Sequence, residues 1–126
     1  MKKIVGMLLA ISFSTAAQAE LVSKILPPEA EAPAHCAAVY GALLGDADSP
    51  AKQAYYFAKS KKMVDQAVVE VESRGMSREQ ARLFTSNLLK QIQDTEKNNN
   101  ALYQTLIKQE LESCETFDVY LKTHRR

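Results

Sequence analysis

The scarcity of chain-breaking residues in the later part of the sequence constrains the fold most strongly. The chain has 126 residues, with only four glycines and four prolines, and neither residue type occurs beyond Gly75. Apolar residues recur at intervals of three and four, as on one face of an α-helix, and the alternation typical of half-buried strands is missing. We therefore expect an all-α domain over residues 34–126.

The first 19 residues have the features of a secretory signal peptide. Two lysines precede the apolar segment Ile4–Phe13, and the small-x-small sequence Ala17-Gln18-Ala19 follows it. The apolar segment is too short to cross a bilayer, which requires about 20 residues. We expect cleavage before Glu20 and delivery to a bacterial periplasm or the medium, with no membrane insertion after cleavage.

The charge of the expected mature chain, residues 20–126, argues against binding to nucleic acid. The whole chain carries a formal net charge of +1, and loss of the two lysines in residues 1–19 makes it −1. Such a chain has no overall positive field to attract a phosphate backbone or an anionic membrane. We therefore expect a protein partner rather than nucleic acid.

An extended arm is expected before the helices. Residues 20–33 contain three of the four prolines, and proline lacks the amide donor and restricts the residue before it. Four helices are expected after the arm, packed as a small antiparallel bundle. The first helix is expected to run from residue 34 to Gly45, and the second from Pro50 to Arg74. The third is expected to begin at Ser77, and the segment 94–100 separates it from the fourth, which continues to the chain end.

Local signals support these limits. Ser49 before Pro50 is a typical N-cap followed by proline at the first helical position, and Ser77 with Gln80 fits a capping box. The three asparagines of Asn98–Asn100 offer a break and an N-cap between the third and fourth helices. The apolar stripe stays in phase across this break, so the alternative is one continuous helix of about 65 Å.

The two cysteines, Cys36 and Cys114, are expected to form a disulfide. An even number of cysteines in a secreted chain indicates bridges, and the first and last helices of an up-and-down bundle are neighbours. Both residues lie on the apolar faces of their helices. Two free buried thiols, or a bridge between chains, are the alternatives.

Metal and cofactor sites have little support in the sequence. His35 and Cys36 are adjacent on a helix and point about 100° apart, so they do not converge on one ion. The haem-attachment motif Cys-x-x-Cys-His is absent, and His124 fits a basic helix end better than an axial ligand. Glu110 lies within the apolar stripe. We expect its side chain to be buried, where it either lines a pocket or forms an ion pair. We expect no cofactor.

One surface is a candidate for partner binding. Tyr56 and Phe57 are expected in the core, which leaves Tyr55 exposed, and tyrosine is enriched in interfaces. Lys59 and Lys62 follow Tyr55 at i+4 and i+7 and share its face of the helix. These three residues form the expected partner surface.

The sequence favours a non-enzymatic protein-binding module of the inhibitor, immunity or chaperone type. It has no glycine-rich phosphate loop, no Gly-x-Ser-x-Gly motif and only two histidines. The alternative is a carrier of a small ligand, haem or metal that uses the seam of the bundle near Glu110. For the oligomeric state, the sequence is compatible with both a monomer and a homodimer.

Overall fold

The computed structural model describes residues 26–124, and this part of the chain contains four α-helices and no β-strand. The helices are α2 (Pro28–Asp46), α3 (Pro50–Glu72), α4 (Arg78–Asn98) and α5 (Asn100–Thr123). The expected all-α class and the number of helices are confirmed. The expected signal peptide, and residues 20–25 of the expected arm, lie outside the described residues.

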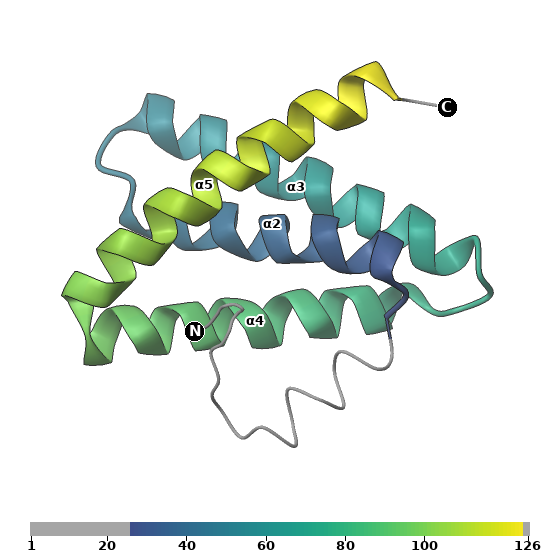
Figure 1. The fold of residues 1–126 in the computed structure, drawn as a ribbon, viewed down its shortest axis with the longest axis horizontal. Coiled ribbons are helices and arrows are strands. Elements are labelled where there is room, and N and C mark those ends of the chain that lie inside the picture. The colour runs from purple at the N-terminus through teal and green to yellow at the C-terminus, as the bar shows by residue number, and fades with distance from the viewer. Residues whose placement is uncertain (1–25, 125–126) are drawn as a thin grey trace.

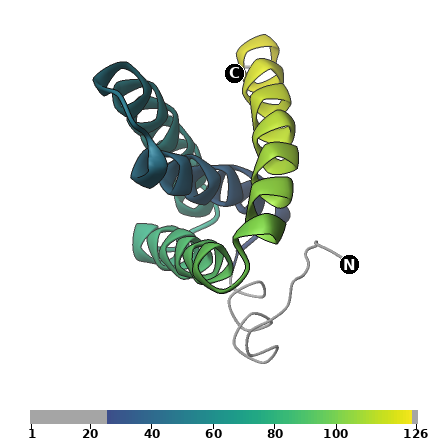
Figure 2. The same ribbon diagram turned by 90° about the vertical axis from the view of Figure 1, so that its left-hand side faces the viewer.

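Helix α2 lies at the centre of the helical bundle. It packs against α3, α4 and α5, whereas α3 and α5 are not a closely packed pair. Seen end-on, α2 is surrounded by the other three helices (Figure 2). Helix α5 crosses the bundle obliquely, and toward their C-terminal ends α3 and α5 diverge (Figure 1). Part of α2 is therefore left uncovered between them.

The expected arm is shorter than residues 20–33, because α2 begins at Pro28. Pro27 is the N-cap, and its carbonyl accepts a hydrogen bond from the Ala30 amide at 2.9 Å. Pro28 occupies the first helical position, where a missing N–H group needs no partner. Pro33 lies inside the helix and is fully buried. The prolines thus start this helix instead of preventing it.

The end of α2 also differs from the expectation. Gly45 is an ordinary helical residue rather than a left-handed cap, and the helix ends at Asp46. The Asp46 carboxylate accepts a hydrogen bond from the Tyr103 hydroxyl of α5 at 2.7 Å. This contact between α2 and α5 gives a physical reason for the extra residue.

The expected start of α3 is confirmed. The Ser49 side chain accepts a hydrogen bond from the Lys52 amide at 3.2 Å, and Pro50 is the first helical residue. The cap satisfies one of the amide groups that have no partner within the helix.

Helix α3 ends at Glu72, two residues before the expected Arg74, and Gly75 follows in the left-handed region with φ 77°. The Gly75 amide bonds to the Glu72 carbonyl at 3.0 Å, and the Met76 amide bonds to the Val71 carbonyl at 2.9 Å. These two bonds define a Schellman motif, in which glycine is favoured at the left-handed position.

The expected limits of α4 are confirmed as well. The Ser77 amide donates to the side chain of Gln80 at 3.1 Å, as in a capping box. Asn99 separates α4 from α5, with φ −154° and ψ 82°, and its side chain accepts from the Leu102 amide at 3.1 Å. The break predicted at Asn98–Asn100 is therefore present, and the single long helix is excluded.

The core consists of two clusters of buried residues that share α2. The first joins α2, α3 and α5, and the second joins α2, α3 and α4. The first contains Cys36, Ala37, Val39, Tyr40, Ala42, Met63, Tyr103, Ile107 and Cys114. The second contains Leu26, Ala30, Ala34, Ala67, Val68, Val71, Ala81 and Phe84.

The expected disulfide between Cys36 and Cys114 is confirmed. It joins α2 to α5 across a Cα–Cα distance of 5.5 Å, and both residues belong to the first core cluster. The two cysteines are therefore neither free thiols nor a bridge between chains.

The expectation that Phe57 lies in the core is wrong. Its neighbour Tyr56 packs against the first cluster and stacks on Tyr40 with 6.4 Å between ring centroids. Phe57 is 59% exposed. Periodicity gives it an inward phase, but it points away from α5. Tyr55 and Lys59, two residues before and after it, contact Glu115 and Asp118 of α5, and residues two apart lie on opposite sides of a helix.

Candidate functional site

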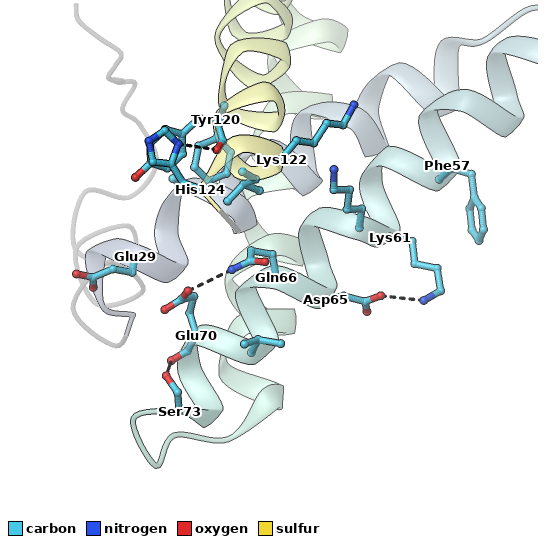
Figure 3. Close-up of a pocket in the computed structure, with 16 residues that line it drawn as sticks. Glu29, Phe57, Lys61, Asp65, Gln66, Glu70, Ser73, Tyr120, Lys122 and His124 are labelled. Carbon is cyan, nitrogen blue, oxygen red and sulfur yellow. Dashed lines mark hydrogen bonds and ion pairs between the residues drawn. The ribbon is translucent and has the colours of Figure 1, made fainter. Parts of the chain in front are cut away.

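The divergence of α3 and α5 leaves an open groove of about 980 Å³ (Figure 3). We call it the α3–α5 groove. Its walls come from α3 and α5, and the first turns of α2 contribute Glu29 and Ala32. Ala32 is exposed in the gap. The apolar side chains that line the groove include Phe57, Val69, Phe117, Tyr120 and Leu121.

A row of stacked rings lies along the α5 wall. Phe117 stacks on Tyr120 with 6.3 Å between ring centroids, and Tyr120 stacks on His124 with 4.1 Å. The spacing of three and four residues places all three rings on one helix face. Tyr120 is nevertheless 52% exposed, so these rings pack on one another while presenting surface to the groove.

Val69 and Phe57 expose apolar surface from the opposite wall, α3. Each is 59% exposed. Single exposed apolar residues are normal on a protein surface, whereas a group of them in a concave site marks a binding surface. Val69 of α3 and Tyr120 of α5 therefore present apolar surface to the same groove from different helices, whereas Phe57 lies at its edge (Figure 3).

A buried carboxylate joins the two walls at the narrow end of the groove. The side chain of Asp118 on α5 is 2% exposed, and Lys59 and Lys62 of α3 both donate to it. Lys122, one turn further along α5, lies 3.7 Å from the same carboxylate. We call these four residues the Asp118 cluster. Three ammonium groups thus surround one carboxylate.

The pKa values within the Asp118 cluster reflect this pairing. Burial alone would raise the pKa of the Asp118 carboxyl, but hydrogen bonds and charge from Lys59 and Lys62 lower it from 3.8 to about 2. Burial alone would lower the pKa of Lys59, and Asp118 raises it overall. Both shifts favour the charged forms, so the ion pair persists at neutral pH.

A second polar contact lies beside the Asp118 cluster. Glu115 on α5 accepts hydrogen bonds from the hydroxyl of Tyr40 at 2.8 Å and from that of Tyr55 at 2.9 Å. Burial, and then the hydrogen bond to Glu115, raise the pKa of Tyr40 far above its ordinary value. The Lys59 ammonium lies 5.3 Å from the centre of the Tyr55 ring. Helix α5 is therefore attached to both α2 and α3 at this level.

The charges at the wide end of the groove have the opposite sign. Arg74 lies between two carboxylates, at 3.2 Å from Glu29 and 2.9 Å from Glu70. One guanidinium thus faces two carboxylates in this group. The groove is cationic where α3 and α5 are joined and anionic where they are farthest apart.

The residues of the expected partner surface occur together at the seam between α3 and α5. Tyr55 is 45% exposed, as expected for an aromatic outside the core. Lys59 is largely buried against Asp118, and Lys62 is partly exposed and lines the groove. Part of the expected surface is therefore involved in contacts within the chain.

Glu110 is not the buried polar residue of α5. Its side chain is 33% exposed, and it pairs with His35 at 2.6 Å. The buried residue is Asp118, which the sequence analysis did not identify. Asp118 lies four residues after Cys114, in phase with the apolar stripe of α5, and this spacing is the sequence signal that could have identified it as buried. Tyr120, the exposed aromatic of the groove, was missed because its exposure depends on the path of α5.

The α3–α5 groove has a mixed lining. It combines exposed aromatic and aliphatic side chains with charges of opposite sign at its two ends. Within residues 26–124, no group of three or more His, Cys, Asp or Glu side chains could hold a metal ion. None of the helices in the same range has the length and apolar character needed to cross a membrane. Comparisons with protein-family models, curated proteins and solved structures gave no match to this chain.

Proposed function

We propose that this chain is a non-enzymatic protein-binding module that holds a helical segment of a partner protein in the α3–α5 groove. The observation that carries the proposal is the open groove with exposed apolar side chains on both walls. Tyr120 on one side and Val69 on the other are each more than half exposed, although both face the same concave space. Binding of an amphipathic helix would bury them.

The size of the groove suits a helix. An α-helix about 10 Å across with a pitch of 5.4 Å occupies roughly 400 Å³ per turn, so a volume of about 980 Å³ accommodates roughly two turns. The occupant would pack on the uncovered part of α2, near Ala32, between α3 and α5. Insertion of an amphipathic helix into an apolar groove is a common mode of protein recognition.

The disulfide gives this binding surface a fixed frame. The bridge between Cys36 and Cys114 joins α5 to the central helix just before the rings of the α5 wall begin. A wall that is already in position loses less conformational entropy on binding. The bridge and the expected signal peptide support a periplasmic or secreted protein, of the inhibitor, immunity or chaperone type.

The test is site-specific photo-crosslinking in cells of a bacterium that carries this gene. A photoreactive phenylalanine analogue replaces Tyr120 on one wall or Val69 on the other. The matched control carries the analogue at Leu83, an exposed apolar residue of α4 outside the groove. We expect one identified protein to crosslink from both walls, through the same helical segment, and not from Leu83.

Binding of that purified protein is then measured by titration calorimetry. We expect Tyr120→Ala to weaken it roughly tenfold or more, because truncating a central aromatic contact often costs more than 1 kcal/mol. The Leu83→Ala variant serves as the control and should bind normally. Crosslinks that occur equally from Leu83, or affinity unchanged in Tyr120→Ala, would refute the proposal.

A second candidate uses the same groove for a small apolar ligand. Its volume lies within the range of known ligand sites, and such sites are lined by aromatic side chains. This replaces the expected carrier site near Glu110, because Glu110 pairs with His35. Native mass spectrometry of the protein purified from its own cells tests this candidate, and a mass equal to that of the chain alone counts against it.

A further inference from the structure

We infer that the helix bound in the groove is acidic at the end that meets Lys62 and Lys122. This inference rests on the proposed function and adds the chemistry of the partner. The groove is not uniformly charged, so it distinguishes the two directions in which an amphipathic helix could lie. The partner class is therefore an amphipathic helix with Asp or Glu at one end and Lys or Arg at the other.

The cationic end has more donors than its own acidic partner can use. Each ammonium group has three donors, whereas Asp118 offers one carboxylate to three lysines. Lys59 is largely buried beside it, but the side chains of Lys62 and Lys122 are 42% and 60% exposed. Both line the groove. Lys62 and Lys122 thus keep donors free for a carboxylate from outside.

The anionic end reinforces the same direction. Glu29 and Glu70 share one cation, Arg74, and the Glu29 side chain is 57% exposed. A carboxylate placed there would meet like charges, whereas a lysine or arginine would be attracted. Between the two ends the walls are apolar and carry the rings of Phe117 and Tyr120. Complementary charges at the ends of an apolar site fix register and suppress wrong partners.

The side chains labelled in Figure 3 agree with this arrangement. Lys122 on α5 and Lys61 on α3 lie on one side of the view, whereas Glu29, Glu70 and Ser73 lie on the other. Lys61 adds no net charge, because it pairs with Asp65 at 2.9 Å. The charge difference along the groove therefore comes from the Asp118 cluster and from the group around Arg74.

The test uses a displayed library of amphipathic helices of 18 residues. All members carry the same leucine and phenylalanine stripe over their two central turns, the length that the groove accommodates, and the positions on either side of the stripe vary among Glu, Lys, Gln and Ala. The library is selected against the full chain and against two double variants of equal net charge. One is Lys62→Gln with Lys122→Gln, and the control is Lys97→Gln with Lys108→Gln, two exposed lysines that do not line the groove.

We expect the unaltered chain and the control variant to select Glu at one end of the helix and Lys at the other. Against the groove variant the preference for Glu should disappear. The best selected peptide should bind the groove variant about tenfold more weakly, because two solvent-accessible ion pairs are lost. Because Lys62 contacts Asp118, circular dichroism must show that this variant is folded. Lys122→Gln alone, which removes only the 3.7 Å contact, provides a second variant with an expected loss of about threefold.

The outcomes separate this inference from the proposed function. Helices selected without a charge preference, or with the same preference against the groove variant, would overturn the inference while helix binding in the groove stands. The Tyr120→Arg variant, whose groove is blocked, serves as the reference. If no helix binds the unaltered chain better than it binds this variant, both the proposed function and the inference fail.

Discussion

Replacing Asp118 by asparagine tests the buried carboxylate that joins α3 to α5. Asparagine has nearly the same shape, so the change removes the charge without leaving a cavity. Lys59 would then stay largely buried, with an exposed fraction of 17%, and without its carboxylate. Lys62 is 42% exposed and can turn toward water. We therefore expect most of the loss of stability to come from Lys59.

The magnitude follows from the pKa of the carboxyl. Its fall from 3.8 to about 2 corresponds to about 2 kcal/mol in favour of the charged form in the folded state. Removing one partner of a buried ion pair costs about 3–5 kcal/mol where the other charge stays buried. Because part of this cluster reaches water, we expect Asp118→Asn to lower the free energy of unfolding by about 2–4 kcal/mol at pH 7.

The assay is urea unfolding followed by circular dichroism between pH 7 and pH 2. A depressed folded-state pKa gives stability that is present above the unfolded-state pKa and is lost as the pH falls through the folded-state value. The difference between the unaltered chain and Asp118→Asn should thus shrink between about pH 5 and pH 2. The control is Asp65→Asn, at an exposed pair with Lys61, with an expected loss of about 0.5 kcal/mol or less. A variant as stable as the unaltered chain at pH 7, or a difference independent of pH, would refute the reasoning.

Three further predictions concern the covalent and local elements of the fold. Reduction of the Cys36–Cys114 bridge, which spans a sequence separation of 78, should lower the free energy of unfolding in urea by about 4.5 kcal/mol; equal stability of both forms would contradict this. Asn99→Ala removes the cap of α5 and should cost about 1 kcal/mol in the same assay, whereas an unchanged midpoint would show that the cap is dispensable. Gly75→Ala should lower stability by about 1–2 kcal/mol because of its positive φ alone, since a Cβ there meets no atom within 4 Å; a neutral effect in thermal unfolding would contradict this.

The parts of the fold that the sequence predicted depend on local signals. Ser49 before Pro50, the capping box at Ser77 and the asparagines around Asn99 each act on the nearest backbone amides, so their effect does not require the rest of the fold. The disulfide was predictable for a different reason. With only two cysteines in the chain, one internal pairing exists, and both residues lay on apolar helix faces.

The errors occurred where distant contacts override local preference. Pro33 was assigned to an extended arm, yet it is buried inside α2, and packing against the core compensates for the hydrogen bond that it cannot donate. Phe57 has the phase of a core residue but is 59% exposed, because burial requires another helix to cover that face of α3. No property of α3 alone determines the path of another helix.

The candidate site was only partly predictable for the same reason. Lys59 and Lys62 were identified as a surface pair from their spacing on one helix. Their common partner, Asp118, lies on α5, and only the fold brings the two helices together. The apolar stripe of α5 includes two acidic positions, Glu110 and Asp118, and the sequence does not show which of them meets a lysine in the interior.

The Asp118 cluster also explains why a groove exists. Up to Cys114, the buried residues of α5 are largely apolar and join the first core cluster. Beyond that point the fully buried side chain is Asp118, whose partners are the long lysine side chains of α3. Apolar helices pack with their axes 8–10 Å apart, whereas a lysine carries its charge on a flexible four-carbon stem.

An ionic contact of this kind joins α3 and α5 without bringing their backbones together, and the two helices are not a closely packed pair. The space that remains exposes Ala32 of α2 and the rings of the α5 wall. If an apolar residue stood at position 118, closer packing of α5 on α3 would be favourable and the groove would narrow. The charged residues that attach the wall are therefore the same ones that keep the groove open, and they place the surplus lysines Lys62 and Lys122 at its end.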